Sequence, residues 1–264
     1  DAIPLLTTKR VYWKTALREL LWFLTGDTNI RSLVSQGVKI WTDWPLDKYR
    51  RETGEAISAE AFEARIIADD RFAAQWGDLG PVYGHQWVNW PRYEPAGEGV
   101  FRRAVQGHNQ IAALIDSLKN NPGSRRHIFT GWNVADLDRM ALPPCHMTYQ
   151  FHVRSDGGLS CLLFQRSCDL GLGFAFNIVE AALLTRMIAQ QCGLHAHEVV
   201  WTGGDVHVYL NHADLVEQQL ARVPDGAPKL RLLRKPASIF DYRFGDFAVE
   251  AYAPQAHISA PVAV

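Results

Sequence analysis

Apolar residues recur every three or four positions in several segments of the chain, which is the pattern of helices with one buried face. Residues 12–25 follow it from Trp13 and Leu17 onward, and Gly26 comes next as a helix stop. Residues 176–192 leave few exposed polar positions, which predicts a helix at the centre of the fold. Shorter helices are predicted over residues 30–36, 59–68, 109–120 and 212–222, the last capped by Asn211.

Short apolar runs rich in β-forming residues dominate the middle of the chain. They predict buried strands of one sheet over residues 127–132, 147–153 and 159–165, and the turn residues 155–158 join the last two. Further strands are predicted over residues 206–210, 229–234 and 246–252.

No linker or repeat interrupts these elements. Residues 45–77 are more polar than the rest, and we interpret them as a variable surface insertion that carries little of the core. Residues 1–264 are therefore predicted to form a single α+β domain, with a large mixed β-sheet covered by helices.

The composition excludes several classes of protein. An apolar fraction of 47% in 264 residues is enough for a large core and excludes dominant disorder. A net charge of -1 argues against general nucleic-acid coating, so any anion site is a local cluster. Apolar runs such as residues 20–24 fall far short of the roughly 20 residues of a membrane span. Four cysteines without a CxxC pair favour a reducing compartment, the cytoplasm, and argue against a disulfide framework or a zinc site.

Cys145 is the first candidate for chemistry. Pro143 and Pro144 restrict the backbone before it, and a strand is predicted directly afterwards, so its thiol is held rigidly. A nucleophilic cysteine needs a nearby cation, for which Arg166 is a candidate. The alternative is a buried structural cysteine, because free cysteines are commonly buried.

Three arginines come at the ends of predicted strands. Arg125 and Arg126 follow a turn, and Arg166 ends a strand, so their guanidinium groups could converge on a phosphate through bidentate bonds. Ser167 would add a hydroxyl donor. The alternative for Arg125 and Arg126 is that both are solvated turn residues.

Three polar residues follow in the second half of the chain. Asn177 enters the long helix, where its amide could pair with the edge of a pyrimidine, although a helix cap is the alternative. Asp205, His207 and Tyr209 alternate, so they are predicted to share one strand face. The pair His207 and Tyr209 could bind a sugar hydroxyl, or could fill purely structural roles.

Glu19 interrupts an otherwise apolar helix face. A half-buried carboxyl group of this kind often has a raised pKa and can hold water for proton transfer. The alternative is a surface glutamate paired with Arg18 or Lys14.

With these residues assembled, the chain resembles the folate-dependent thymidylate synthases over nearly its whole length. Eight ordered motifs carry the resemblance: PLLTTKR at 4–10, ELLWFLTGDTN at 19–29, GDLGPVYGHQW at 77–87, SRRHIFTGWN at 124–133, MALPPCH at 140–146, LSCLLFQRSCDLGLG at 159–173, WTGGDVHVYLNH at 201–212 and the C-terminal APVAV.

The resemblance implies a role for each candidate. Cys145 resembles the nucleophile that adds to C6 of dUMP, so that C5 can attack the methylene group of 5,10-methylenetetrahydrofolate. Arg166 and Ser167 resemble residues that bind the phosphate of dUMP, and Arg125 and Arg126 resemble a pair that binds the phosphate in the neighbouring subunit. Asn177 resembles the residue that recognises uracil, and His207 and Tyr209 resemble residues that bind the ribose. The residues that match a proton-transfer role are Glu19, Tyr83 and His146.

The resemblance also implies a folate pocket and a partner. The positions that match the pocket are Ile40, Trp41, Trp44, Leu142, Asp169, Leu172, Gly173, Phe176 and Ala263, and Asp169 also matches a nucleotide-binding position. The family forms homodimers through the sheet. The methylenetetrahydrofolate is a co-substrate that also supplies the hydride, so no metal is expected.

The chain departs from the family pattern around the amide that recognises the pyrimidine. The family usually has Pro-Phe-Asn-Ile-Ala-Ser-Tyr there, whereas this chain has Ala175, Val179, Glu180 and Ala181 at the changed positions. Val88 replaces a common arginine, and Asn109 replaces a common aspartate.

Two alternatives to a thymidylate synthase stay open at this point. One is a pyrimidine-nucleotide hydroxymethylase, in which water instead of hydride reacts with the methylene group and tetrahydrofolate is released. The other is a catalytically silent protein that uses the arginines to hold nucleotide or RNA. The presence of Cys145, Glu19, Tyr83, Asn177 and His207 argues against the second, because phosphate binding needs none of them.

Overall fold

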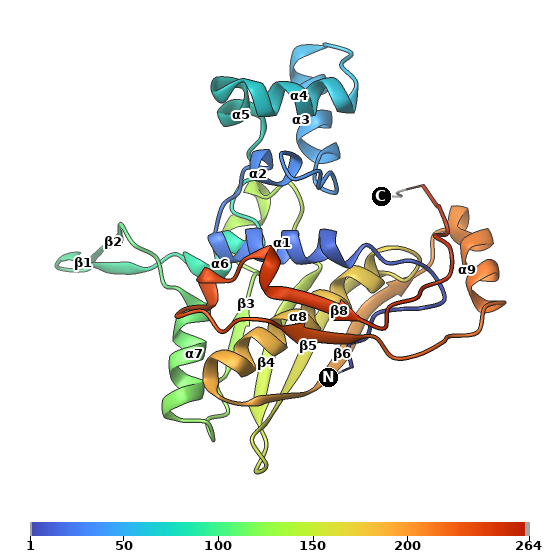
Figure 1. Cartoon of the computed structure of the whole chain (residues 1–264). Helices are drawn as coiled ribbons and strands as arrows, with labels where there is room; N and C mark the ends of the chain where they lie inside the picture. The colour runs from blue at the N-terminus through green and yellow to red at the C-terminus, as the bar shows by residue number, and fades with distance from the viewer. Residues whose placement is uncertain (1, 262–264) are drawn as a thin grey trace. The chain divides into compact units, whose positions relative to one another are not determined.

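A computed structural model describes residues 2–261 of the chain (Figure 1). The chain divides into two compact units. Unit 1 comprises Asp1–Leu21, Leu114–Phe129 and Cys145–Val264, and unit 2 comprises Trp22–Ala113 and Thr130–Pro144. Two helices contribute to both units, α1 (Trp13–Thr25) and α7 (Gln110–Asn120), and both were predicted from their apolar spacing. Each unit is described by itself.

A mixed sheet forms the centre of unit 1. Its strands are β3 (Ile128–Thr130), β4 (His146–Val153), β5 (Gly158–Asp169) and β6 (His195–His207), in that spatial order. The β4–β5 pair is antiparallel and the β5–β6 pair is parallel, so the predicted α+β class with a mixed sheet is confirmed.

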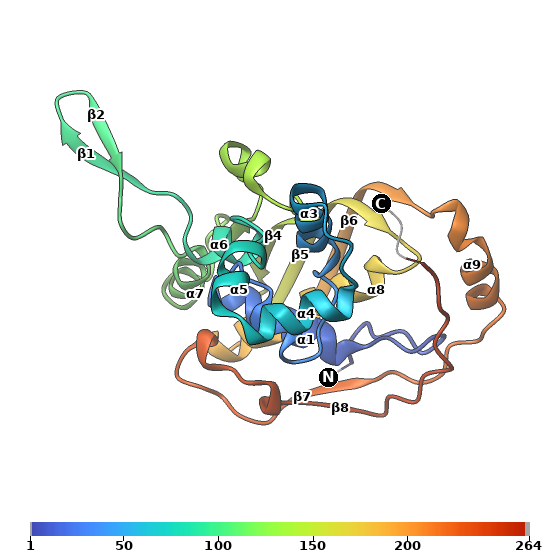
Figure 2. The ribbon, with the colours of Figure 1, turned by 90° about the horizontal axis from the view of Figure 1, so that it is seen from above.

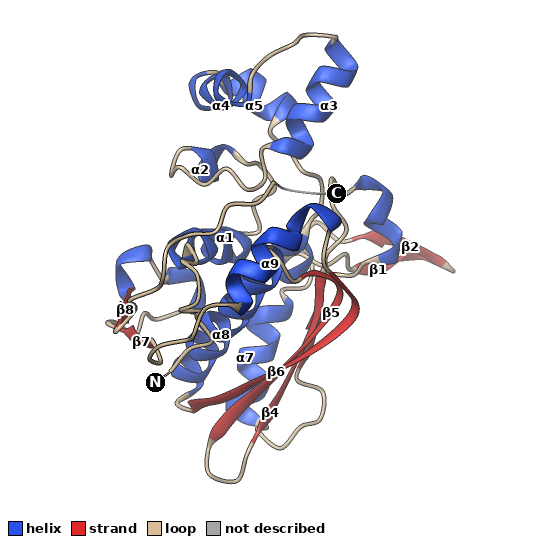
Figure 3. Cartoon of the chain, turned by 90° about the vertical axis from the view of Figure 1, so that its right-hand side faces the viewer, coloured by secondary structure: helices blue, strands red, loops and turns tan. Residues whose placement is uncertain are grey.

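The long helix α8 (Gly173–Cys192) connects β5 to β6 and covers one face of the sheet (Figure 3). A parallel pair requires such a crossover, because a tight turn cannot join two parallel strands. Leu159, Cys161 and Leu163 are fully buried on the covered face, whereas Leu162 between them is 37% exposed. The predicted strands are therefore buried on one face, because successive side chains point to opposite faces of the sheet and α8 covers one of them.

The C-terminal part of unit 1 contains α9 (Ala213–Leu220), β7 (Lys229–Leu232) and β8 (Phe247–Glu250), and Figure 2 shows β7 and β8 side by side. Short 3-10 turns at Leu210–His212, Ile239–Asp241 and Phe244–Asp246 connect them. The strand predicted over 206–210 is displaced, since β6 already ends at His207. Asn211 does not cap α9, because it lies inside a 3-10 turn and His212 takes the capping position.

Unit 2 is built mainly from short helices. They are α2 (Arg31–Val34), α3 (Asp43–Thr53), α4 (Ala59–Ala68), α5 (Asp70–Trp76) and α6 (Tyr83–Val88), followed by the hairpin β1 (Tyr93–Gly97) and β2 (Val100–Arg103) and by a 3-10 turn at Val134–Arg139. The helix predicted over 59–68 matches α4, whereas that predicted over 30–36 shortens to the single turn of α2.

The expectation that residues 45–77 carry little of the core is wrong. Figure 1 shows α3, α4 and α5 gathered into one group. Tyr49 lies at its centre, with ring-centroid distances of 5.6 Å to Phe62, 5.3 Å to Phe72 and 4.9 Å to Trp76. Phe62 is fully buried. The polar residues of this segment lie on the outside of a small aromatic core. The average polarity of the whole segment does not show this core, because the polar residues outnumber the aromatic ones.

Among the residues that the structure describes, no helix is both long and apolar enough to cross a membrane.

Candidate functional site

Cys145 and Arg166 are brought together by the pairing of β4 with β5. Cys145 comes directly before β4, and His146 pairs with Gln165 across the two strands. The backbone N–H of Arg166 donates to the carbonyl oxygen of Cys145 at 2.9 Å. The side chain follows the backbone, and Nη2 of Arg166 lies 3.8 Å from Sγ of Cys145. A guanidinium beside a sulfur stabilises the thiolate, which is the nucleophilic form of cysteine.

The other three cysteines are unsuited to that role. Burial raises the pKa of Cys161 to about 12 and that of Cys168 to about 11, and it also raises the pKa of Cys192. These side chains stay as thiols at neutral pH. Cys145 is half-buried, so the alternative of a fully buried structural cysteine does not describe it.

Gln165 orients Asn177. Its Nε2 donates to Oδ1 of Asn177 at 2.8 Å and to the carbonyl oxygen of Ser167 at 3.0 Å. Its Oε1 accepts from the indole N–H of Trp201 at 3.0 Å. Asn177 is therefore tied to the sheet by its side chain, and the helix-cap alternative is wrong. Sequence reasoning missed Gln165 and Trp201, although a polar residue at the end of an apolar strand was a signal for Gln165.

The parallel pairing of β5 with β6 aligns a second group of polar residues. Ser167 pairs with Asp205, and Asp169 pairs with His207. Nδ1 of His207 lies 3.0 Å from Oδ1 of Asp205, and the rings of His207 and Tyr209 are 5.0 Å apart. Tyr209 lies beyond the end of β6, so the prediction that Asp205, His207 and Tyr209 share one strand face is wrong. The side chains of His207 and Tyr209 are nevertheless neighbours.

Asp169 anchors the loop that leads into α8. Its Oδ1 accepts from the backbone N–H of Gly171 at 2.8 Å and lies 3.5 Å from Nδ1 of His212. Lys9, which sequence reasoning left without a role, donates from Nζ to the carbonyl oxygen of Gly171. Burial lowers the pKa of Lys9, and the charge of Asp169 acts in the opposite direction. The predicted pocket residues Leu172, Gly173 and Phe176 follow directly, and all three are half-buried.

Glu19 lies in the interior and is only 7% exposed. The surface alternative for this residue is therefore wrong. Its neighbour is Glu180 of α8, whose pKa is raised well above the usual range by burial and by the charge of Glu19. Oε2 of Glu180 lies 3.7 Å from Nε2 of His146, whose Nδ1 is 3.0 Å from the hydroxyl of Tyr149. Burial lowers the pKa of His146 to about 3, so its ring is neutral at pH 7.

Arg125 and Arg126 are exposed on the segment before β3. Within the described part of the chain, neither guanidinium forms a hydrogen bond or an ion pair. The structure of one chain therefore does not bring these two arginines together with Arg166. Such a position is compatible with a role toward another molecule.

The remaining predicted residues belong to unit 2. Trp41 and Tyr83 lie with Phe23 in one buried aromatic cluster, with centroid distances of 5.8 Å between Trp41 and Tyr83 and 4.8 Å between Phe23 and Tyr83. A Cβ on Gly84 would lie 2.2 Å from the carbonyl oxygen of Phe23, so only glycine permits this approach of α6 to α1. Trp44 packs on Trp41 at 5.3 Å.

The three other residues that match the family's folate pocket, Ile40, Leu142 and Ala263, differ in how they are placed. Ile40 is 40% exposed, and Leu142 is half-buried. Both are apolar side chains of unit 2. Ala263 lies outside the described residues.

A buried polar network holds α6 of unit 2. Nε2 of Gln86 donates to Oδ2 of Asp136 at 2.9 Å, and Nδ2 of Asn133 donates to the same oxygen at 3.0 Å. Arg139 forms an ion pair with Asp136 at 2.8 Å. This network fixes the helix that carries Tyr83, and the sequence alone did not identify it.

The departures from the family pattern occupy ordinary structural positions, except for Glu180. Asn109 still caps α7, because its Oδ1 accepts from the backbone N–H of Ala112 at 2.9 Å. Ala175 and Ala181 are buried in α8. Val88 ends α6 and lies against Gly26.

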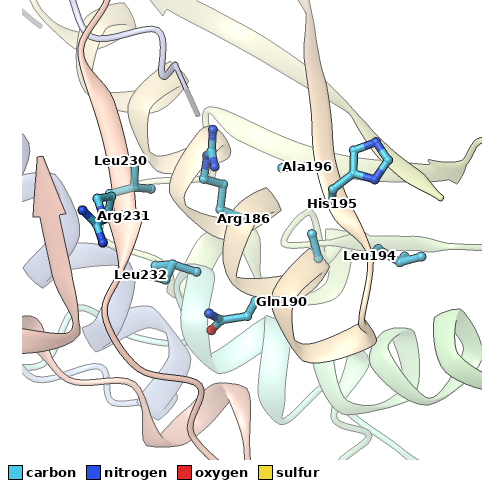
Figure 4. Close-up of a pocket in the computed structure, with 9 residues that line it drawn as sticks. Arg186, Gln190, Leu194, His195, Ala196, Leu230, Arg231 and Leu232 are labelled. Atoms are coloured by element: carbon cyan, nitrogen blue, oxygen red, sulfur yellow. The ribbon is translucent and has the colours of Figure 1, made fainter. Parts of the chain in front are cut away.

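A pocket of about 510 Å³ lies elsewhere in unit 1, between α8, the start of β6 and β7 (Figure 4). Arg186, His195 and Arg231 are among its lining residues, and Figure 4 shows them well separated from one another. It contains none of the predicted site residues. Among the described residues, no group of three or more His, Cys, Asp or Glu side chains is placed to hold a metal ion.

Comparison with known proteins identifies the family. A family model described as thymidylate synthase matches residues 1–264. A thymidylate synthase of Sphingopyxis alaskensis is 88% identical over 264 residues, which cover 100% of this chain and 85% of the relative. Those of Novosphingobium aromaticivorans and Rhizorhabdus wittichii are 67% and 64% identical, and each alignment covers 99% of this chain and 83% or 85% of the relative. The chain therefore belongs to the thymidylate synthase family.

Proposed function

We propose that the chain converts dUMP to dTMP by reductive methylation, with 5,10-methylenetetrahydrofolate as the donor of both the one-carbon unit and the hydride. Membership of the family, which consists of methyltransferases, supports this activity. The single observation that carries it is the thiol of Cys145 with the Arg166 guanidinium 3.8 Å away.

The nucleophile of this reaction is the Cys145 thiolate. A bond forms between its sulfur and C6 of dUMP, and the electron pair of the C5–C6 double bond makes C5 nucleophilic. C5 then bonds to the methylene carbon as one of the two bonds from that carbon to folate nitrogens breaks. Loss of the C5 proton to a base breaks the second carbon–nitrogen bond and leaves an exocyclic methylene group on C5. A hydride from the folate, which is thereby oxidised to dihydrofolate, reduces this group, and the sulfur departs as the C5–C6 double bond returns. A thiolate suits these steps because it both adds and leaves readily.

The phosphate and ribose of dUMP are proposed to lie across the ends of β5 and β6. Arg166 and Ser167 bind the phosphate, and Arg166 thereby faces both the phosphate and the nucleophile. His207 and Tyr209, which lie side by side, donate or accept at the ribose hydroxyl.

Asn177 is proposed to recognise the pyrimidine. Because Gln165 donates into its Oδ1, the amide is fixed in one orientation with its Nδ2 group as the available donor. A donor at this place matches the O4 acceptor of uracil and opposes the amino group of cytosine. This geometry favours dUMP over dCMP.

Proton transfer at the pyrimidine is proposed to involve Glu19, Tyr83 and His146, through ordered water. Glu19 is proposed as the acid–base group of this set, because a ring with a pKa of about 3 is too weak a base to take up a proton near pH 7.

The folate is proposed to bind among the apolar side chains of Ile40, Trp41, Trp44, Leu142, Leu172 and Phe176, together with Asp169, Gly173 and Ala263. Half-buried aromatic and aliphatic groups fit a flat heterocycle, and Trp44, Leu142 and Phe176 are of this kind. The bound folate supplies the one-carbon unit and the hydride, and the residues of this set exclude water from the reacting atoms.

The protein is proposed to act as a homodimer through the uncovered face of the sheet. Leu162, Val200 and Val206 are 37%, 41% and 42% exposed on β5 and β6, so these apolar side chains meet solvent when the chain is alone. A second copy of the chain would bury it and would bring Arg125 and Arg126 of the partner subunit to the phosphate. All four cysteines are free thiols, which is typical of a reducing compartment, so we infer that the protein works in the cytoplasm.

The hydroxymethylase alternative finds no support in the comparisons, because the relatives carry the name thymidylate synthase. A spectrophotometric assay with dUMP and methylenetetrahydrofolate tests the proposal. We expect dihydrofolate and dTMP to be formed in equal amounts. Formation of tetrahydrofolate and hydroxymethyl-dUMP would support the hydroxymethylase, and tight dUMP binding without turnover would support a silent binding protein.

The variant Cys145→Ser provides the control for the nucleophile. Serine keeps the shape but has a far less acidic group, so we expect turnover to fall by several orders of magnitude while dUMP binding persists. Equilibrium binding of dUMP, measured beside the rate, separates these two effects. Full activity of the variant would exclude Cys145 as the nucleophile.

A further inference from the structure

His212 is a fully buried histidine at the start of α9, and none of the roles assigned above falls on it. Its backbone N–H donates to the carbonyl oxygen of Tyr209 at 2.8 Å, and the rings of the two residues lie 5.4 Å apart. A buried polar ring finds its hydrogen-bond partners in the chain and not in bulk solvent. The groups around the ring therefore decide what it can hold together.

The two ring nitrogens of His212 face two segments that are distant in the chain. Nε2 lies 2.8 Å from the carbonyl oxygen of Pro261. Nδ1 lies 3.5 Å from Oδ1 of Asp169 and, among the described residues, forms no hydrogen bond. The ring thus lies between the C-terminal segment and the loop that follows β5.

The contact with Pro261 fixes which nitrogen of the ring carries a hydrogen. A carbonyl oxygen only accepts hydrogen bonds, so Nε2 must be the donor. A neutral ring with its hydrogen on Nδ1 would instead place two lone pairs against each other at 2.8 Å. A hydrogen on Nε2 is therefore a measurable consequence of this contact.

The loop after β5 packs directly on the same ring. Gly171 lies so close that a Cβ on it would be 2.5 Å from Nδ1 of His212. The backbone N–H of Gly171 donates at 2.8 Å to Oδ1 of Asp169, which is the oxygen that faces the ring. Leu172 and Gly173 follow, and both belong to the proposed folate pocket. A shift of the ring would therefore move residues that are proposed to bind folate.

The C-terminal segment has attachments of another kind further back in the chain. Nη1 of Arg222 donates to the carbonyl oxygen of Ala256 at 2.6 Å, and Ile258 is buried. None of these residues belongs to the proposed site. The contact at Pro261 differs, because His212 also lies against two residues of that site.

We propose that His212 is a positioning residue, which donates from Nε2 to Pro261 and so ties the C-terminal segment to the loop of Asp169. The tie is independent of the activity, whereas its effect on folate binding rests on the proposed function. Without the tie, the loop and the segment keep more conformational freedom, which the folate must remove when it binds. Loss of this hydrogen bond therefore weakens folate binding.

Nitrogen-15 NMR of the histidine rings in the wild-type protein tests the tie directly. The ring of His212 is assigned through its nuclear Overhauser contacts with the ring of Tyr209. We expect a hydrogen on Nε2 at pH 7, and we expect it to exchange slowly with solvent because the ring is fully buried. A ring that carries its hydrogen on Nδ1 alone overturns the proposal, whether or not any variant folds.

Two variants of matched length separate the hydrogen bond from the packing of the ring. In His212→Gln the amide nitrogen can still donate to Pro261, whereas His212→Met has a similar length and no donor. We expect KM for methylenetetrahydrofolate to rise about tenfold in His212→Met and by no more than about threefold in His212→Gln. Their kcat values should agree within about twofold, because the hydrogen bond serves binding and not the chemical step.

Binding of dUMP provides the internal control. Both variants should bind it alike, because the backbone N–H of residue 212 still holds Tyr209. An equal KM for methylenetetrahydrofolate in the two variants would leave the ring a merely structural role and would overturn the positioning role.

The readouts also separate this proposal from the proposed function. A wild-type protein that forms dTMP but carries the hydrogen on Nδ1 retains the proposed function and loses the tie. A wild-type protein with a hydrogen on Nε2 and no dTMP formation keeps the tie and loses the proposed function.

Discussion

The buried side chain of Gln165 determines how the amide of Asn177 is oriented. Gln165 is only 1% exposed, yet its three hydrogen bonds join β5, α8 and β6. Asn177 depends on it for its orientation, and an amide in the wrong orientation presents an acceptor where uracil also has an acceptor. The selectivity proposed for Asn177 therefore depends on Gln165, which is not itself proposed to contact the ligand.

Replacing Gln165 tests whether the orientation of Asn177 depends on it. Gln165→Met keeps the length but leaves the Trp201 indole N–H without its acceptor, which costs about 1–3 kcal/mol of unfolding free energy. We expect KM for dUMP to rise about tenfold or more, because Asn177 loses its fixed orientation. Steady-state kinetics and urea unfolding measure the two effects. The control Gln218→Met, on the exposed side of α9, should leave both unchanged, and an unaltered KM in Gln165→Met would contradict the argument.

His146 makes the stability depend on pH. Its folded pKa of about 3 lies below the unfolded value of about 6.5, so the stability gained from burying the neutral ring is full above pH 6.5 and is lost as pH falls. Between pH 7.5 and pH 5 the loss is about 2 kcal/mol. The raised pKa of Glu180 acts with the opposite sign, because the folded chain then takes up a proton.

The comparison with His146→Asn isolates this contribution. We expect the variant to lose about 2 kcal/mol less than the wild type between pH 7.5 and pH 5, as measured by urea unfolding at each pH. Parallel losses in the two proteins would show that His146 is not buried in its neutral form.

The residue types of the sequence suggest the proposed site residues more readily than the residues that contact them. Cys145, Arg166 and Asn177 stand in motifs whose chemistry is recognisable from the residue types. Gln165 and Glu180 lie against segments that are distant in the chain, and no local pattern specifies such contacts. The same limit explains why Glu19 retained a surface alternative until its burial was known.

At the level of elements, the chain shows that polar composition can hide a core. Helices α3, α4 and α5 carry many charged residues on their outer sides, while Tyr49, Phe62, Phe72 and Trp76 meet inside. Helical positions predicted from periodicity agree well with the structure, as α1, α4 and α7 do. Strand boundaries agree less well, and β6 begins at His195, whose polar neighbours hide its alternation.

Phe62→Ala tests how much this small aromatic core contributes to the free energy of unfolding. Removing a fully buried aromatic ring costs about 3–5 kcal/mol, whereas a residue of a peripheral insertion would cost almost nothing. Thermal and urea unfolding give the loss. Phe101→Ala is the control within the same unit, since Phe101 is 65% exposed, and it should change the unfolding free energy by about 0.5 kcal/mol or less. Equal effects of the two substitutions would contradict the assignment.

At the level of the whole molecule, the proposed site needs two copies of the chain. Arg125 and Arg126 are exposed, and the face of the sheet that α8 leaves uncovered carries apolar side chains. A site assembled in this way can be repaired by mixing two inactive proteins, provided that each supplies what the other lacks.

Subunit mixing tests this arrangement. Cys145→Ser and Arg126→Ala should each be inactive or nearly so as separate proteins. Unfolding and refolding them together should restore about a quarter of the wild-type activity, because half of the dimers are mixed and each contains one complete site. Analytical ultracentrifugation of the mixture checks the dimer. Failure to regain activity in a confirmed dimer would place Arg126 and Cys145 in the same chain's site.

The parallel pairing of β5 with β6 also fixes the order in which unit 1 can assemble. β4 and β5 meet across the few residues of a tight turn, so their pairing closes a short loop and forms early. β6 can join β5 only after the 20 residues of α8 have been laid over the sheet. In this order the nucleophile at the head of β4 is in place before the supports that β6 brings, and the burial of Glu180 within α8 comes later.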